Sequence, residues 1–331
     1  MPTLLVTKKM SPELAARVRA SVDGRRAAPG SKLAPRATSV LRLGATATIV
    51  IAGIWLGVSL YRAQRELEAR RAELVAKAQR EAAELGPDEH AVATRALPWL
   101  PPFAGAYPGD LVADELRPAG ALPSVLSRPT LYLRGSLPSV ASRVDESAAS
   151  SFKDAFVLCL VAPPNARTEP LLKAKARAVL SGRGEALAPV AGVERLQDAL
   201  VGLPFLSPEW ERKVRAARSR EDLERMRRDF ERAPIARAKA AAKAKLLLVV
   251  VDEPNSEPGP TELDGERPHD VRVGLVDLVT RKVLLRLRRR VDPSWISAAT
   301  RAEWASGIDS CALAMDVHAA VASGGRVATG E

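Results

Sequence analysis

The chain has 331 residues, a formal net charge of +11 and an apolar fraction of 47%. A charge of that size usually suggests a nucleic-acid partner, but nine Lys and Arg residues against two acidic ones precede residue 43. Residues 62–331 hold 41 basic and 37 acidic residues, so this large part is nearly neutral and we expect it to bind no nucleic acid.

Residues 1–38 mix Pro, Ser, Gly, Ala and basic residues without sustained periodicity. This composition predicts a disordered basic tail. Beside a membrane, such a tail is attracted to anionic headgroups by about 1 kcal/mol for each Lys or Arg.

Between Arg42 and Arg62 the chain runs for nineteen residues without a charge. As a helix this stretch would extend roughly 28 Å, close to the thickness of a bilayer's hydrocarbon core. Tyr61 at its end suits the interfacial aromatic belt. We therefore predict an uncleaved transmembrane helix over residues 39–61, with the lipid bilayer as its partner. Gly53 and Gly57 form a GxxxG pair, the spacing that would let two copies pack as a homodimer.

The orientation of the predicted span follows from the flanking charges. Nine basic residues precede it and six lie in residues 62–85, which favours a cytoplasmic N-terminus. A short basic tail also resists translocation, whereas a long C-terminal domain crosses largely regardless of its charge. The domain after the span is therefore expected to be extracytoplasmic.

Two segments connect the span to the folded domain. Residues 62–85 are rich in strong helix formers, have leucines at heptad spacing and end at Gly86-Pro87, which predicts a helical stalk with a short coiled-coil pattern. Residues 86–130 contain eight prolines and are predicted to form a semi-rigid linker. Its apolar stretch 97–103, LPWLPPF, is expected to dock on the domain.

Residues 131–331 are predicted to form one soluble α/β or α+β domain, with a mixed sheet of about four to five strands flanked by helices. The predicted strands are LYLRGSL from Leu131, DAFVLCLVA from Asp154, KLLLVVVDE from Lys245, and the hairpin VRVGLVD and KVLLRLRRR. The predicted helices are TEPLLKAKARAVLSG, GVERLQDALVGL, a long segment from Ser207 to about Ala244 that breaks near Ser219, and Ser297 to about Ala322.

Two basic surfaces stand out in this domain. In the second hairpin strand Arg286, Arg288 and Arg290 alternate with apolar residues, so they share one face and are a candidate partner surface. The segment 209–245 has thirteen basic and seven acidic residues. Acid-first pairs four apart, such as Glu211 with Arg215 and Glu224 with Arg228, favour a solvated helix face over a patch for anionic polymers or headgroups.

The chain contains no P-loop, GxSxG, HExxH, EF-hand or GxGxxG motif, and its three histidines lack ligand spacing. We therefore assign no catalytic, cofactor or metal residue and expect no cofactor. Cys159 and Cys311 would form a disulfide in an oxidising compartment, or remain two buried thiols.

The sequence thus favours a single-pass membrane-anchored protein whose extracytoplasmic α/β domain binds or scaffolds an unidentified protein or envelope partner. One alternative is a membrane-anchored enzyme that uses the strand-end acids Asp252, Glu253 or Asp277. A second alternative is a signalling protein that acts through its basic N-terminal tail.

Overall fold

The structure is a computed structural model that describes residues 35–181, 190, 192–254, 265 and 267–324, with side chains described from residue 50 onward. The chain divides into two compact units, residues 1–66 and 67–331. The predicted disordered tail lies mostly outside the described residues. Its last four residues, 35–38, are helical instead, because Pro35 suits the first turn of a helix and the residues after it continue the turn.

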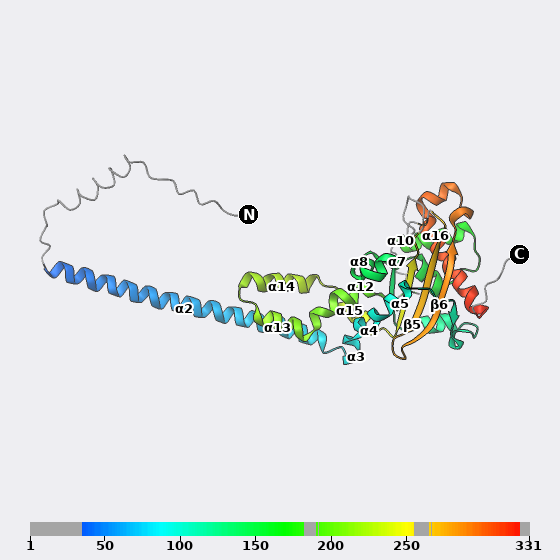
Figure 1. Cartoon of the computed structure of the whole chain (residues 1–331). Coiled ribbons are helices and arrows are strands. Elements are labelled where there is room, and N and C mark those ends of the chain that lie inside the picture. The colour runs from blue at the N-terminus through cyan, green and yellow to red at the C-terminus, as the bar shows by residue number, and fades with distance from the viewer. Residues whose placement is uncertain (1–34, 182–189, 191, 255–264, 266, 325–331) are drawn as a thin grey trace, which may run out of the picture. The chain divides into compact units, whose positions relative to one another are not determined.

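The described part of the first unit belongs to α2 (Pro35–Ala82), a helix of 48 residues that contains the predicted span and stalk (Figure 1). Large apolar side chains between Val50 and Tyr61 are exposed on this helix. A Cβ added at Gly53 or Gly57 would meet nothing within 4 Å. Within the described residues, no helix combines the length and the apolarity needed to cross a membrane.

The second unit is built on one six-stranded mixed sheet in the order β1-β6-β5-β4-β2-β3. Strands β2, β3 and β4 run parallel, whereas β5, β6 and β1 continue the sheet with antiparallel pairing. The strands are β1 (Leu111–Val112), β2 (Thr130–Ser136), β3 (Val193–Arg195), β4 (Leu246–Asp252), β5 (His269–Asp277) and β6 (Lys282–Val291). The predicted mixed α/β class is confirmed.

The sheet has more strands than predicted because its edge strands are very short. Strand β1 has two residues and β3 has three, too few for a periodic pattern to be visible in the sequence. The stretch GVERLQDALVGL, predicted to be entirely helical, begins with β3 and becomes helical only in α12 (Leu196–Gly202).

Helices cover both faces of the sheet. Leu246, Leu248 and Val250 of β4 belong to one apolar cluster, whereas Leu247 and the alternate valines belong to the other, as a strand period of two requires. The first cluster is covered by α6 (Ala121–Leu126), α9 (Ala155–Val161), α10 (Glu169–Ser181) and α16 (Ala298–Ala322). The second is covered by α5 (Leu100–Ala104), α7 (Leu137–Ser142), α8 (Val144–Ser150), α12, and α15 (Ile235–Ala242).

The prediction of a strand at DAFVLCLVA is wrong, because this stretch forms helix α9. The Asp154 side chain caps the helix by accepting a hydrogen bond from the Val157 amide at 3.2 Å. All residues from Ala155 to Leu160 are buried, so the helix is apolar on every side. A short run of this kind has the same pattern as a buried strand.

The predicted linker 86–130 is not an extended spacer. It forms short helices and one strand that pack on the domain, with prolines at first helical turns where no amide hydrogen is needed. Phe103 lies over Gly274 of β5, where an added Cβ would come within 2.1 Å of its ring. Besides α5, α6 and β1, the segment contains α3 (Pro87–His90), α4 (Val92–Ala96), η1 (Leu97–Trp99) and η2 (Asp114–Leu116).

Candidate functional site

Most of the predicted basic segment lies in a structure that we call the helical arm, formed by α2 residues 67–82, α13 (Pro208–Ala216) and α14 (Arg220–Arg232) (Figure 1). The hydroxyl of Ser207 accepts the Trp210 amide at 3.2 Å, and that of Ser219 accepts the Asp222 amide at 3.0 Å. The predicted break near Ser219 is therefore confirmed, but the stretch from Ser207 to about Ala244 forms three helices and not two, because a second break at residues 233–234 separates α14 from α15. We call residues 217–219, which join α13 to α14, the arm tip.

An aromatic cluster holds the helices of the arm together. The Trp210 ring stacks on Phe230 with the ring centroids 5.1 Å apart, and Phe205 meets both rings edge-on. Lys77 of α2 lies over the Phe230 ring at 5.5 Å. Trp210 and Phe230 are both buried, so these aromatics are occupied inside the arm and are not presented for stacking on bases.

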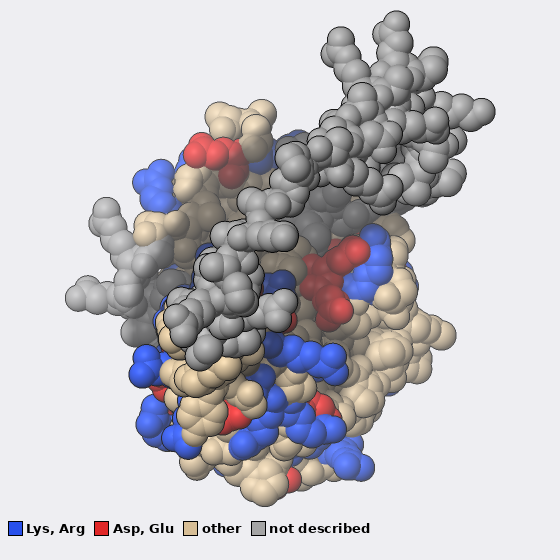
Figure 2. Space-filling view, turned by 90° about the vertical axis from the view of Figure 1, so that its left-hand side faces the viewer, with Lys and Arg blue, Asp and Glu red and all other residues tan. Residues whose placement is uncertain are grey.

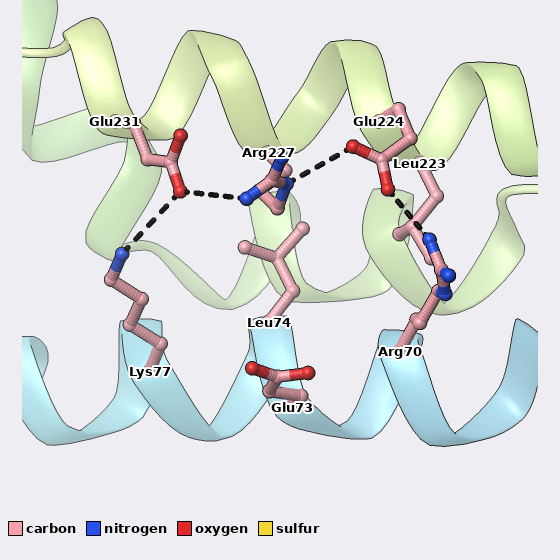
Figure 3. A pocket seen from close by; sticks show the side chains of 8 residues that line it. All are labelled: Arg70, Glu73, Leu74, Lys77, Leu223, Glu224, Arg227 and Glu231. Carbon is pink, nitrogen blue, oxygen red and sulfur yellow. Dashed lines mark hydrogen bonds and ion pairs between the residues drawn. The ribbon is translucent and has the colours of Figure 1, made fainter. Parts of the chain in front are cut away.

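Ion pairs cross the groove between α2 and α14, which has a volume of about 400 Å³ (Figure 3). Arg70 of α2 meets Glu224 at 2.7 Å, and Lys77 approaches Glu231 at 3.9 Å. Arg227 connects the same two carboxylates from within α14, at 3.1 and 3.2 Å. The acids that face α2 are thus neutralised inside the groove.

The outward side of the arm is basic. Between residues 207 and 232 nine Lys and Arg residues are exposed, against four acidic ones. Of the predicted pairs four residues apart, Glu211 with Arg215 forms, at 3.8 Å, while Glu224 instead pairs with Arg70 and Arg227. Four basic residues have no ion-pair partner among the described residues, and all four are exposed: Lys213, Arg218, Arg228 and Arg232. Figure 2 shows Lys and Arg side chains gathered on one face of the molecule.

A second charged site lies inside the domain, at the end of the parallel strands. Arg134 of β2 binds Asp252 of β4 through two hydrogen bonds of 3.0 and 2.9 Å. It also donates to Asp154 at 3.0 Å and to Ser310 of α16 at 2.7 Å. The Asp252 side chain is fully buried and that of Arg134 is 12% exposed, so this is an internal ionic network.

His269 at the start of β5 completes this network. Its Nε2 lies 3.1 Å from Asp252, and its Nδ1 lies 2.8 Å from the Arg267 carbonyl oxygen. Burial lowers the pKa of His269, but the hydrogen bonds to these two acceptors outweigh it and raise the pKa above its usual value. Burial likewise works against the charge of Asp252, yet Arg134 and His269 lower its pKa to about 2.

Arg134 is a site residue that the sequence patterns did not identify. The available signal is an arginine between apolar residues in LYLRGSL, because an arginine inside a sheet needs a carboxylate partner. The partner lies 118 residues away in the chain, and nothing in the local pattern identifies it.

Asp309 of α16 lies next to this network and differs from its neighbours. It is 3% exposed, and its Oδ2 has no hydrogen-bond partner among the described residues. Burial raises the pKa of Asp309 to about 7, although the charges of His269 and Arg167 act in the opposite direction. The folded protein therefore keeps a proton on this carboxyl at pH values where the unfolded chain has released it.

We expect Asp309→Asn to stabilise the fold at pH 8 by about 1 to 3 kcal/mol and to have little effect near pH 4. The unfolded carboxyl ionises near its ordinary pKa of 3.8 and the folded one near 7, so the stability of the natural protein falls as the pH rises between these values. Urea unfolding of both proteins at the two pH values measures the difference. Asp229→Asn, on the exposed side of α14, is the control and should change stability by less than about 0.5 kcal/mol. Equal effects of Asp309→Asn at both pH values would contradict the prediction.

The strand-end acids Asp252, Glu253 and Asp277, which are the candidates for an enzymatic function, all form ion pairs. Asp252 belongs to the buried network, and Glu253 meets Arg272 and Arg288, each at 2.6 Å. Asp277 accepts from Arg128 at 2.8 Å and from the Val279 amide at 2.8 Å. In the described part of the chain, no group of three His, Cys, Asp or Glu residues could hold a metal ion.

The predicted arginine row on β6 is divided by these contacts. Arg286 donates from Nε to the Gly109 carbonyl oxygen at 2.8 Å, beside edge strand β1. Arg288 forms ion pairs with Glu253 at 2.6 Å and Asp270 at 2.9 Å, whereas Arg290 is exposed. Two of the three side chains thus bind groups of the domain itself, and the row does not present a continuous basic surface.

A disulfide joins Cys159 of α9 to Cys311 of α16, with the two Cα atoms 5.2 Å apart. Both cysteines are fully buried in the apolar cluster under the sheet, and 152 positions of sequence separate them. Of the two states left open by the sequence, the structure has the bonded one.

Comparison with known protein families, with curated proteins and with solved structures finds no match to this chain.

Proposed function

We propose that this is a single-pass membrane-anchored protein whose extracytoplasmic α/β domain binds or scaffolds a partner at the membrane. The observation that carries the proposal is the exposure of the apolar side chains from Val50 to Tyr61 of α2. Among them Ile51 is 67% exposed, Ile54 63% and Trp55 71%. A helix that is apolar on all sides needs an apolar environment, and a contiguous patch of this kind marks a membrane or protein interface.

The uncharged stretch extends beyond the side chains that the structure describes. Residues 43–49, which complete the nineteen, contain no Asp, Glu, Lys or Arg, and their backbone is helical. Arg42 and Arg62 at the two ends suit the headgroup regions of a bilayer. Gly53 and Gly57 have open space around them, which fits a proposed homodimer through this helix.

Two features support an extracytoplasmic domain. The basic residues before the span favour a cytoplasmic N-terminus. The disulfide between Cys159 and Cys311 favours an oxidising compartment, because cytosolic thiols are normally kept reduced. Binding is preferred to catalysis because Asp252, Glu253 and Asp277 are committed to ion pairs, whereas the arm presents exposed basic side chains without such partners.

We expect the full-length protein to stay in the membrane pellet after extraction with alkaline carbonate. A protease added to intact spheroplasts should remove a tag placed at its C-terminus. The double change Ile54→Lys and Leu56→Lys should release the protein into the soluble fraction, since each charge near the middle of a span costs about 2.5 to 3.5 kcal/mol. The matched control is a double lysine change at Ala69 and Ala72, exposed positions beyond the span, which should leave the protein in the pellet.

Release of the natural protein by carbonate would refute the anchor. Retention in the pellet together with a tag that is degraded only after permeabilisation would leave the anchor in place and refute the orientation.

A further inference from the structure

We propose that the arm tip docks on the anionic lipid headgroups of the membrane that anchors the chain, and so fixes the orientation of the domain on that membrane. This inference rests on the proposed membrane anchor and adds a second contact with the bilayer. Three features of the chain support the docking: the direction in which the arm folds along α2, the distribution of charge along the arm, and the length of chain between the tip and the predicted span.

The arm folds so that its tip lies beside the first turns of α2 in this unit. The Arg71 guanidinium donates a hydrogen bond to the Ala217 carbonyl oxygen at the tip. At the other end of the arm, Gln79 donates to Glu211 at 2.8 Å. The chain therefore enters this unit, at Leu67, on the side where the tip lies.

A short tether separates the tip from the predicted span. Arg71, the residue that contacts the tip, comes ten positions after Tyr61, the last residue of the uncharged stretch. That length of helix corresponds to about 15 Å. The polar headgroup layer occupies roughly the first 6 Å beyond the hydrocarbon core, and charges act over about 10 Å at moderate ionic strength. A tether of this length therefore keeps the tip within the range of charged headgroups.

Positive charge is concentrated in the half of the arm nearest the tip. Residues 212–225 hold six basic and three acidic residues, whereas the remaining residues of α13 and α14, 208–211 and 226–232, hold three basic and four acidic ones. Glu224 is neutralised by Arg70 and Arg227, and Asp222 pairs with Arg225. Lys213 and Arg218 are exposed and have no ion-pair partner among the described residues. A planar anionic surface matches this arrangement because it requires positive charge at the tip and no shaped cavity.

A nucleic acid fits the arm less well than a lipid surface. Single strands need exposed aromatic platforms, and the arm buries Trp210 and Phe230 in its own core. Because the anchor tethers the tip to the membrane, the effective concentration of headgroups at the tip is high, and a few exposed basic residues suffice for docking. Each basic residue at an anionic surface is expected to change the ratio of docked to undocked tip by about five-fold.

The test uses the full-length protein carrying Ala216→Cys, an exposed position next to the tip, labelled with an environment-sensitive NBD fluorophore. The chain has two cysteines and they are bonded to each other, so the new thiol is the one that reacts. The labelled protein is reconstituted in nanodiscs of phosphatidylcholine, with and without phosphatidylglycerol. We expect a blue shift of NBD emission, and quenching by lipids carrying a nitroxide, in the anionic discs, with both effects lost at high salt.

The pair Lys213→Glu and Arg218→Glu should abolish the blue shift. The matched pair Arg228→Glu and Arg232→Glu makes the same change of charge at exposed residues farther from the tip, and should leave the shift in place. A protein that fails to enter the discs refutes the anchor and this inference together. Incorporation with identical emission in both kinds of disc refutes the docking alone, as does an equal loss of the shift in the two double variants.

Discussion

Replacing Arg134 with methionine is expected to lower the free energy of unfolding by about 3 to 5 kcal/mol, because it leaves the buried carboxylate of Asp252 without its arginine partner. Arg134 makes four side-chain hydrogen bonds, two to Asp252 and one each to Asp154 and Ser310. Asp252 is fully buried, so water cannot replace the lost partner. Urea unfolding at pH 7 should show a lower midpoint with an unchanged dependence on denaturant.

The pH dependence of this loss tests its electrostatic origin. The pKa of Asp252 is about 2 in the folded protein and 3.8 without the fold, so its contribution is complete above pH 4 and disappears as the pH falls towards 2. The Arg134→Met variant should therefore differ less from the natural protein at pH 3 than at pH 7. The matched control is Arg143→Met, whose pair with Glu146 is 57% and 64% exposed, and it should cost less than about 1 kcal/mol. A loss at Arg134 as small as that at Arg143 would contradict the prediction.

The elements that the sequence predicts well are those with strong local signals. Strand β4 is a run of leucine and valine that follows α15, and the alternation in β5 and β6 matches a hairpin. At the helix starts Ser207 and Ser219, the serine hydroxyl accepts a hydrogen bond from the amide three residues later in the chain. Because both partners are close in sequence, the local sequence is sufficient to locate these starts.

The elements that the sequence predicts badly are those whose state is decided by tertiary contacts. Helix α9 is apolar on every side because it packs against α16, α10 and α6 within the apolar cluster on one face of the sheet, and only its cap at Asp154 distinguishes it from a strand. In the segment 86–130 the prolines suggest a spacer, but Leu100 and Phe103 gain apolar burial by packing on the domain. Gly274 makes that packing feasible, since any side chain there would overlap Phe103.

The candidate sites divide in the same way. The basic character of residues 209–245 is visible in the sequence, but the groove that neutralises Glu224 and Glu231 forms only when α14 packs on α2. Arg134 and Asp252 belong to strands that are neighbours in the sheet and distant in the chain. The sequence shows the charged residues of both the groove and the Arg134 network. Which residues pair with each other depends on how the helices and strands are arranged in the fold.

Removing the disulfide by the double change Cys159→Ala and Cys311→Ala is expected to lower the free energy of unfolding by about 2 to 5 kcal/mol. The bond closes a loop of 152 positions between α9 and α16, and a loop of that length restricts the unfolded chain strongly. Both positions are fully buried in the same apolar cluster, so the two lost sulfur atoms add a small packing defect to this loss. Urea unfolding of the oxidised natural protein and of the variant, under identical conditions, measures the sum.

A reductant distinguishes the contribution of the disulfide bond to the free energy of unfolding from the contribution of side-chain packing. Unfolding in dithiothreitol should lower the stability of the natural protein towards that of the double variant, and should leave the stability of the variant unchanged.

Alkylation of thiols, begun in intact cells before lysis and completed under denaturing conditions, tests the proposed location of the domain. If the domain lies on the oxidising side of a membrane, both cysteines should be bonded and should not react with the alkylating agent even in the denatured chain. Complete labelling of Cys159 and Cys311 in that experiment would contradict the extracytoplasmic placement, whereas protection of both would be expected only if the bond forms in the cell.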